Sequence, residues 1–236
     1  METRQIEIRR NVVERGLMAV KDYVVHNRRL VAYSAAGTLA GIMLIVVMVV
    51  YYDYRAGGEL VQFEQLLDKY RASYPADDKE RDAALEKTVK ELGAVVESSH
   101  WGYVHEFGYY IIGNLYYSEK KYKEAREYFL KFADSSSGSY FAPMGLQQAA
   151  RSSEYLGDIK DARKIYSRLE KDYEKSAIAD QIQYDLGRIY EQEGDGVRAR
   201  ECYNKVLAGF PRSPFAQKAK ERIILLGLAE RKDPRP

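Results

Sequence analysis

Cysteine is almost absent from this chain of 236 residues, which carries a single one, Cys202. One cysteine cannot build a disulfide framework within the chain or a cysteine-ligated metal cluster. The sequence also lacks any Asn-x-Ser/Thr signal for glycosylation. A bacterial periplasm is compatible with both absences, since an oxidising compartment does not oblige a protein to carry disulfides.

An excess of charge of one sign is missing as well. The 37 lysines and arginines nearly balance the 35 aspartates and glutamates, so the formal net charge is only +2. A protein that binds nucleic acid needs a concentrated basic face to neutralise phosphates. We therefore expect proteins or extended peptides as partners, and no nucleic acid.

Sequence signals for catalysis are lacking too. The chain has no Gly-rich phosphate loop, no G-x-S-x-G elbow and only three histidines, His26, His100 and His105. A zinc site at His100 and His105 would need further ligands, for which Glu97 and Glu106 are the nearest candidates. We predict no catalytic residue, no metal site and no cofactor. An enzymatic or enzyme-associated module held by an anchor is the alternative.

A long stretch without charged side chains covers residues 30–52, LVAYSAAGTLAGIMLIVVMVVYY. As a helix, 23 residues extend about 34 Å, which exceeds the roughly 30 Å of a hydrocarbon core. Tyr33 near one end and Tyr51 and Tyr52 at the other suit the bilayer interfaces. We predict a transmembrane helix in contact with lipid. A cleaved signal peptide, whose apolar core and basic head are shorter, and a buried core helix are the alternatives.

The charges that flank this stretch predict its orientation. Basic flanks stay in the cytoplasm, and the segment before the span is basic whereas the segment after it is nearly balanced. We therefore place residues 1–29 in the cytoplasm of a bacterium, the span in its inner membrane and the remainder in the periplasm. The cytoplasmic segment is either a topology signal or a docking site for a cytoplasmic partner. Its basic residues are Arg4, Arg9, Arg10, Arg15, Lys21, Arg28 and Arg29.

Two glycines within the span, Gly37 and Gly41, have the spacing that lets two membrane helices approach closely. This spacing predicts a homo-oligomer that associates through the span. The same spacing also arises by chance in spans rich in glycine and alanine.

Small and aromatic residues recur at a fixed interval of 37 positions after residue 100. A period of this size is typical of helical repeat proteins, in which each repeat is a helix pair. The columns are Gly113, Ala150 and Gly187; Ala125, Ala162 and Ala199; Phe129, Tyr166 and Tyr203; Ser139, Ser176 and Ser213; and Ala142, Ala179 and Ala216. We predict that the small residues let paired helices nest and that each aromatic ring fills the remaining gap.

These columns resemble the tetratricopeptide repeat (TPR), whose pattern is W-x2-L-G-x2-Y, then A-x3-F, then P. The first copy reads Tyr109, Ile112, Gly113, Tyr116, Ala125 and Phe129, and the third reads Gln183, Leu186, Gly187, Tyr190, Ala199, Tyr203 and Pro211. The sequence departs from the pattern in its period and in lacking the opening aromatic residue in copies two and three. The resemblance implies an all-α chain with a right-handed solenoid of about three helix pairs.

The predicted helices follow from turn signals between the columns. We expect pairs at 105–118 with 121–134, 139–156 with 159–172, and 176–193 with 196–208, and a capping helix at 213–229. The serines of the fourth column are expected as N-caps, and Ile223, Ile224, Leu225, Leu226 and Leu228 as the apolar surface of the capping helix. Residues 53–100 are a helical lead-in with a hinge at Gly57-Gly58, residues 101–230 the TPR domain and residues 231–236 a disordered tail.

An anchor, a short lead-in and TPRs outside the membrane resemble the bitopic ancillary subunit of the bacterial Sec translocon (the YfgM type). This resemblance implies an interaction scaffold or chaperone-like adaptor without catalytic activity. The segment Phe210-Pro-Arg-Ser-Pro-Phe-Ala216 also resembles envelope TPR proteins. Outer-membrane assembly or cell-wall coordination, by a homo-oligomer, is therefore the alternative function.

TPRs bind extended peptides along the concave face that the first helix of each pair forms. The family pattern places three residues of each repeat on this face: Tyr110, Asn114, Tyr117, Gln147, Arg151, Glu154, Tyr184, Arg188 and Glu191. Arginine and tyrosine are common binding anchors. In the alternative interpretation, Arg151 pairs with Glu154 and Arg188 with Glu191 as ordinary surface ion pairs.

Overall fold

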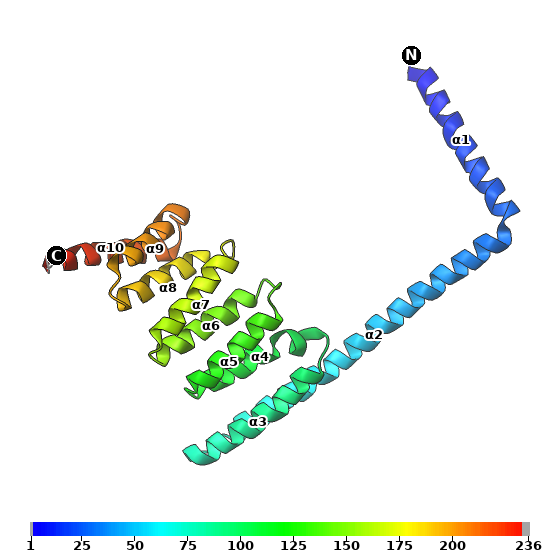
Figure 1. Cartoon of the computed structure of the whole chain (residues 1–236). Helices are drawn as coiled ribbons and strands as arrows, with labels where there is room; N and C mark the ends of the chain where they lie inside the picture. The colour runs from blue at the N-terminus through cyan, green and yellow to red at the C-terminus, as the bar shows by residue number, and fades with distance from the viewer. Residues whose placement is uncertain (1, 233–236) are drawn as a thin grey trace. The chain divides into compact units, whose positions relative to one another are not determined.

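A computed structural model describes residues 2–232, with side chains described from residue 13 to residue 228. Every regular element in that range is an α-helix and no strand occurs there, so the predicted all-α class is confirmed (Figure 1). The helices are α1 (Glu2–His26), α2 (Arg28–Ala72), α3 (Asp78–Ser98), α4 (Gly102–Ser118), α5 (Tyr122–Ser135), α6 (Ala142–Tyr155), α7 (Ile159–Asp172), α8 (Ala179–Gln192), α9 (Gly196–Gly209) and α10 (Pro214–Lys232).

Helix α2 contains the predicted membrane span. It has 45 residues, and its apolar part is long enough to cross a bilayer while none of that part is buried against protein. Gly37 and Gly41 have no neighbouring side chain near their α-carbons. Helix α2 continues through Gly57-Gly58, where the sequence predicts a hinge, and the boundary between the two compact units of the chain lies two residues earlier, at Arg55 and Ala56. Two helical glycines cost only about 1–2 kcal/mol together, which the continuing backbone hydrogen bonds and the packing of the following residues offset.

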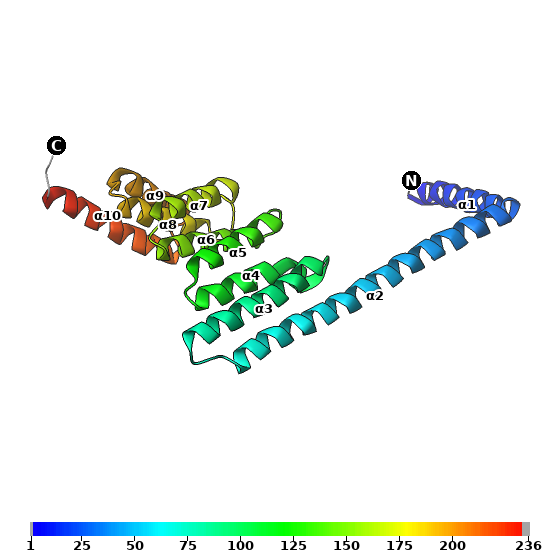
Figure 2. The same cartoon turned by 60° about the horizontal axis from the view of Figure 1, so that its bottom comes forward.

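The end of α2 and helix α3 form the lead-in to the repeats and lie side by side (Figures 1 and 2). Phe63 and Leu67 of α2 are buried in the same core as Leu85 and Leu92 of α3. Asp77 caps α3, since its side chain accepts hydrogen bonds from the backbone N–H groups of the second and third residues that follow it, at 2.9 and 3.1 Å.

Three helix pairs follow, α4 with α5, α6 with α7 and α8 with α9, at positions that the sequence predicts (Figure 1). The predicted starts of α6 and α8 at serines are wrong: these helices begin three residues later, at Ala142 and Ala179. The carbonyl groups of Ser139 and Ser176 instead accept hydrogen bonds from those alanines in a turn that precedes the helix. The serines therefore belong to the connections between repeats, which are three residues longer than in a 34-residue TPR.

The small and aromatic columns bring the two helices of a pair together. The α-carbon of Gly113 faces the ring of Phe129 so closely that an added Cβ would lie 2.8 Å from it, and Gly187 faces Tyr203 more closely still. The other small residues at these contacts, Ala125, Ala150, Ala162 and Ala199, and the rings of Phe129, Tyr166 and Tyr203 are fully buried. Dispersion contacts and apolar burial at these points hold the helix pairs together.

Helix α10 covers the last repeat, as predicted for a capping helix. Ala216 and Ala219 are buried against Tyr203 and Val206 of α9. The predicted apolar surface is only partly correct, since Ile223 and Leu226 pack here while Ile224, Leu225 and Leu228 are about half exposed. Successive helical positions point in different directions, so five of six consecutive residues cannot share one face. The predicted disordered tail begins too early, because α10 includes residues 231 and 232, and residues 233–236 lie outside the described part.

Cys202 lies in α9 with 5% of its surface exposed. Burial raises the pKa of its thiol to about 11, which keeps the thiol protonated at neutral pH. We expect alkylation by iodoacetamide at pH 8 to be about a hundredfold slower in the native protein than in urea, because the thiolate fraction falls tenfold per unit of pKa. Mass spectrometry of quenched samples measures this rate directly, since no other thiol exists in the chain. Equal rates in both states would contradict the burial of α9.

Candidate functional site

The structure brings four of the nine predicted concave-face residues together in one open pocket. Residues of α4, α6, the start of α7 and α8 enclose a volume of about 480 Å³. The lining residues are Tyr117, Arg151, Glu154, Tyr155, Ile159, Arg188 and Gln192. Sequence analysis missed Tyr155, Ile159 and Gln192, because they lie at helix ends, one residue or more beyond the positions that the TPR pattern assigns to the concave face.

The other five predicted residues lie outside the pocket. The ring of Tyr110 packs 5.1 Å from that of Phe132, and the ring of Tyr184 packs 5.4 Å from that of Phe215. Gln147 is buried, with 9% of its surface exposed, and Asn114 is half-buried. Glu191 accepts a hydrogen bond of 2.6 Å from the hydroxyl of Tyr203 and pairs with Arg222. Internal packing therefore uses many of the side chains that the TPR pattern assigns to ligand binding.

A cross-repeat ion pair forms one wall of the pocket. Arg188 of α8 donates two parallel hydrogen bonds of 3.0 and 3.1 Å to the carboxylate of Glu154 in α6. Tyr166 of α7 donates a third, of 2.8 Å, to the same carboxylate. The alternative pairs, Arg151 with Glu154 and Arg188 with Glu191, are therefore wrong. The stacking of α8 on α6 brings Arg188 to Glu154, and a bidentate contact satisfies this half-buried carboxylate well.

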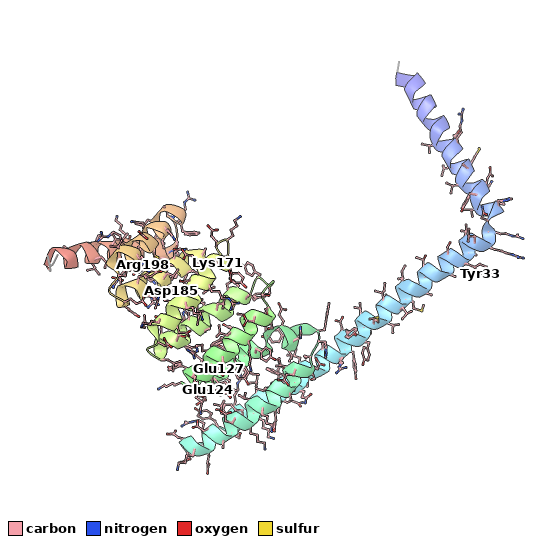
Figure 3. The ribbon with its side chains drawn as sticks, in the orientation of Figure 1. Tyr33, Glu124, Glu127, Lys171, Asp185 and Arg198 are labelled. Carbon is pink, nitrogen blue, oxygen red and sulfur yellow. The ribbon has the colours of Figure 1, made fainter. Side chains whose placement is uncertain are left out.

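Asp185 lies on α8 (Figure 3), three residues before Arg188, and contacts the guanidinium of this ion pair. Only 5% of it is exposed, and it accepts hydrogen bonds of 3.2 Å from Arg188. Burial raises the pKa of this carboxyl, although the charges of Arg188 and Arg151 lower it. For Arg188, burial lowers the pKa, but hydrogen bonds with Glu154 and the two carboxylate charges outweigh burial and raise it. Two carboxylates thus contact Arg188 directly. No pattern in the sequence marks Asp185, because it occupies a position of the repeat at which Gln148 and Arg222 stand in the neighbouring helices.

Arg151 occupies the same place in its repeat as Arg188 but has no carboxylate to pair with. One repeat earlier, Tyr117 stands where Arg188 finds Glu154. Within residues 13–228, Arg151 makes one side-chain hydrogen bond, of 3.3 Å, to the neutral amide of Gln148, and no ion pair is found there. Its guanidinium therefore contacts no carboxylate directly, although its charge still lowers the pKa of Asp185.

Tyrosine rings border the pocket on the side of Arg151. The rings of Tyr122 and Tyr155 stack with their centroids 4.7 Å apart, and Tyr117 meets the ring of Tyr155 edge-on at 5.7 Å. Burial and a hydrogen bond with Tyr155 raise the pKa of Tyr117 to about 12, so its hydroxyl is neutral and able to donate. An arginine beside rigid aromatic rings suits a ligand that offers a carboxylate next to apolar groups.

The histidines lie away from this pocket. His100 and His105 each place a ring nitrogen near a backbone carbonyl oxygen, at 2.8 Å from Ser98 and 2.9 Å from Ser99. Among the residues that the structure describes, no group of three or more histidine, cysteine, aspartate or glutamate side chains has the arrangement of a metal site. The pocket itself is lined by hydrogen-bonding and charged groups together with tyrosine rings.

Comparison with known proteins identifies the repeats. Residues 108–137 and 148–214 each match a model of the tetratricopeptide repeat. A "TPR repeat-containing protein" of Treponema pallidum (strain Nichols) is 22% identical over 133 residues, which are 56% of this chain and 55% of that protein. The chain thus spans about half the length of the curated relative that it matches.

Two solved structures of MamA are also similar to this chain. The first has a TM-score of 0.48 and 16% identity, over 65% of this chain and 83% of that one. The second, MamA AMB-1, has a TM-score of 0.43 and 14% identity, over 72% of this chain and 95% of that one.

Proposed function

We propose that this chain, which contains tetratricopeptide repeats over residues 108–137 and 148–214, is a membrane-anchored scaffold without catalytic activity that binds an extended polypeptide. The apolar part of α2 is the anchor, and the segment 1–29 is its cytoplasmic side. The repeats act on the periplasmic side of a bacterial inner membrane.

The observation that carries this proposal is the guanidinium of Arg151, which contacts no carboxylate directly, beside Tyr117 and Tyr155 in an open pocket. Every other charged side chain that lines the pocket is held by the cross-repeat ion pair. A buried or half-buried cation favours an opposite charge, and a peptide carboxylate supplies it at low cost because the tyrosine rings are already fixed by stacking. The preferred ligand is a peptide with an acidic side chain or a C-terminal carboxylate next to an apolar residue.

Two processes are consistent with such a scaffold. An anchor with periplasmic TPRs suits handling of exported polypeptides, including association with the Sec translocon. Gly37 and Gly41, which are open to an approaching helix, favour the second candidate, a homo-oligomer in envelope assembly or cell-wall coordination.

Photocrosslinking in intact cells tests the pocket and separates these processes. With a photoreactive amino acid at Tyr155, we expect adducts to an exported or translocon polypeptide under the first process. Substitution of Arg151 by alanine is expected to lower the adduct yield about tenfold, since a charge-assisted contact contributes about 1.5–3 kcal/mol. Lys164→Ala, on the outer helix α7, is the matched control and should leave the yield unchanged.

Adducts between two copies of this chain would instead favour the homo-oligomer. Equal yields with and without Arg151 would contradict binding in this pocket.

A further inference from the structure

Two loops without charged residues lie at one edge of the helical domain. The α3–α4 connection and the first residues of α4, 98–104, read SSHWGYV, and the α5–α6 connection with its flanks, 135–144, reads SSSGSYFAPM. The next connection on that edge, between α7 and α8, carries Lys171, Asp172, Glu174 and Lys175. On this edge, the loops without charge are therefore the two that precede and follow the first helix pair.

These loops expose aromatic side chains. Trp101, the single tryptophan of the chain, is 62% exposed, and Tyr103 and Tyr140 are 52% and 72% exposed. The ring of Phe107 joins the two loops, since it lies 5.0 Å from the ring of Tyr103 and 5.0 Å from that of Phe141. We refer to Trp101, Tyr103, Tyr140 and Phe141 as the aromatic edge.

The α3–α4 loop packs against α2. Its aromatic rings are therefore exposed although the loop is held in place. Gly102 has a φ of +85°, and a Cβ added there would lie 2.9 Å from that of Ala56 in α2. The hydroxyl of Ser99 donates a hydrogen bond to Glu59 of α2, and the carbonyl of Ser99 accepts one from His105 if that ring nitrogen carries the proton. These contacts place Trp101 beside the first turn of α2 beyond the apolar stretch.

The distance along α2 from the apolar stretch to this contact is short. Ala56 follows Tyr52, the last residue of that stretch, by four positions, which is about 6 Å of helix. The interfacial layer outside each side of a hydrocarbon core is about 5–8 Å thick. The chain between the apolar stretch and this contact is therefore too short to hold the α3–α4 loop far from the headgroups, the layer in which tryptophan and tyrosine rings are favoured.

We infer that the aromatic edge docks on the outer surface of the same bilayer, with the ring of Trp101 in the interfacial layer. This inference rests on the membrane anchoring in the proposed function. A lipid surface fits better than a polar protein surface because both loops lack charge. Docking fixes the height of the first repeat above the membrane. The pocket therefore binds peptides at a constant distance from the bilayer.

The single tryptophan makes this docking measurable in the full-length protein. Vesicles of phosphatidylcholine and phosphatidylglycerol are prepared with acyl chains brominated either near the glycerol or near the terminal methyl. We expect lipids brominated near the glycerol to quench most of the Trp101 emission and deep bromine to quench little. Aqueous iodide should quench weakly, and the emission maximum should lie at shorter wavelength than that of the urea-unfolded chain.

The matched control moves the tryptophan to the opposite edge of the domain. In the variant Trp101→Phe with Val197→Trp, the new ring replaces a side chain that is 70% exposed at the start of α9. Its emission is expected to respond to iodide and not to either brominated lipid. Quenching of this control by brominated lipid would overturn the inference, since the contact would then not belong to the aromatic edge.

Extraction with alkaline carbonate separates the two levels of the proposal. If the protein stays with the vesicles while Trp101 remains open to iodide and insensitive to bromine, the anchor holds and the docking inference is overturned. That result would leave the aromatic edge as a surface for a protein partner. If the protein is extracted, the anchoring of the proposed function fails and the inference fails with it.

Discussion

Truncation of Phe129 to alanine is expected to lower the free energy of unfolding by about 3–5 kcal/mol. The ring is fully buried, faces the α-carbon of Gly113 and lies 5.5 Å from the ring of Tyr110. Removing it leaves a cavity in the place where α4 and α5 nest and where α6 approaches both. Each repeat of a solenoid contacts only its neighbours, so no other part of the core compensates for this loss. Urea unfolding of the full chain in detergent, followed by helical circular dichroism, measures the change.

Tyr140→Ala is the matched control for that experiment. Its ring is 72% exposed, so its removal should change the free energy of unfolding by less than about 0.5 kcal/mol. A loss below about 1 kcal/mol for Phe129→Ala would mean that the ring does not fill a buried helix contact. The interpretation of the 37-residue columns as nesting positions would then be wrong.

The positions of the helices could be predicted from the sequence because they depend on local and periodic signals. A small residue at Gly113 and a ring at Phe129 recur one period later, and each recurrence identifies a helix pair. Asp77 was recognisable as a cap because an N-cap bonds to backbone groups two and three residues away. Such signals need no knowledge of how the helices pack.

The binding pocket could be predicted only in part, because ion-pair partners depend on contacts between repeats. The spacing of three residues suggests that Arg188 pairs with Glu191, but stacking brings Glu154 within 3.0 Å. The repeats themselves contain a signal that could have shown this. Where the aromatic column has tyrosine, as at Tyr166 and Tyr203, a glutamate lies twelve residues before the tyrosine. The carboxylate of this glutamate accepts a hydrogen bond from the tyrosine hydroxyl.

Where that column has Phe129, which lacks a hydroxyl, the corresponding position is Tyr117 and no carboxylate is present. The first repeat therefore needs no internal acceptor, and Arg151 one repeat later finds no partner. Phe129 in place of a tyrosine, together with Tyr117 in place of a glutamate, thus leaves Arg151 without a direct carboxylate partner in the pocket. Internal hydrogen bonds thus use the concave-face glutamates of the later repeats, whereas the proposed binding depends on Arg151 beside Tyr117 of the first repeat.

Replacement of Glu154 by glutamine is the second large effect that we expect, with a loss of about 1–3 kcal/mol in the free energy of unfolding. The change removes the charge that pairs with Arg188 and weakens the acceptor of the buried Tyr166 hydroxyl. The estimate stays below that for a fully buried ion pair because 31% of the Arg188 side chain and 15% of the Glu154 side chain are exposed. Urea unfolding measures it, with Asp134→Asn as the control: its partner is Arg168, its side chain is 61% exposed and little change is expected.

A double-mutant cycle with Arg188→Leu shows whether the two repeats are coupled through this pair. The single change at Arg188 leaves Asp185 buried without its cation, so part of its cost is independent of Glu154. The remainder should be shared, and the coupling energy is expected to reach about 1 kcal/mol or more for a bidentate contact. Strict additivity would mean that the carboxylate and the guanidinium do not stabilise the repeats together. Glu154 would then be free to meet a ligand, and the pocket would offer a peptide both signs of charge.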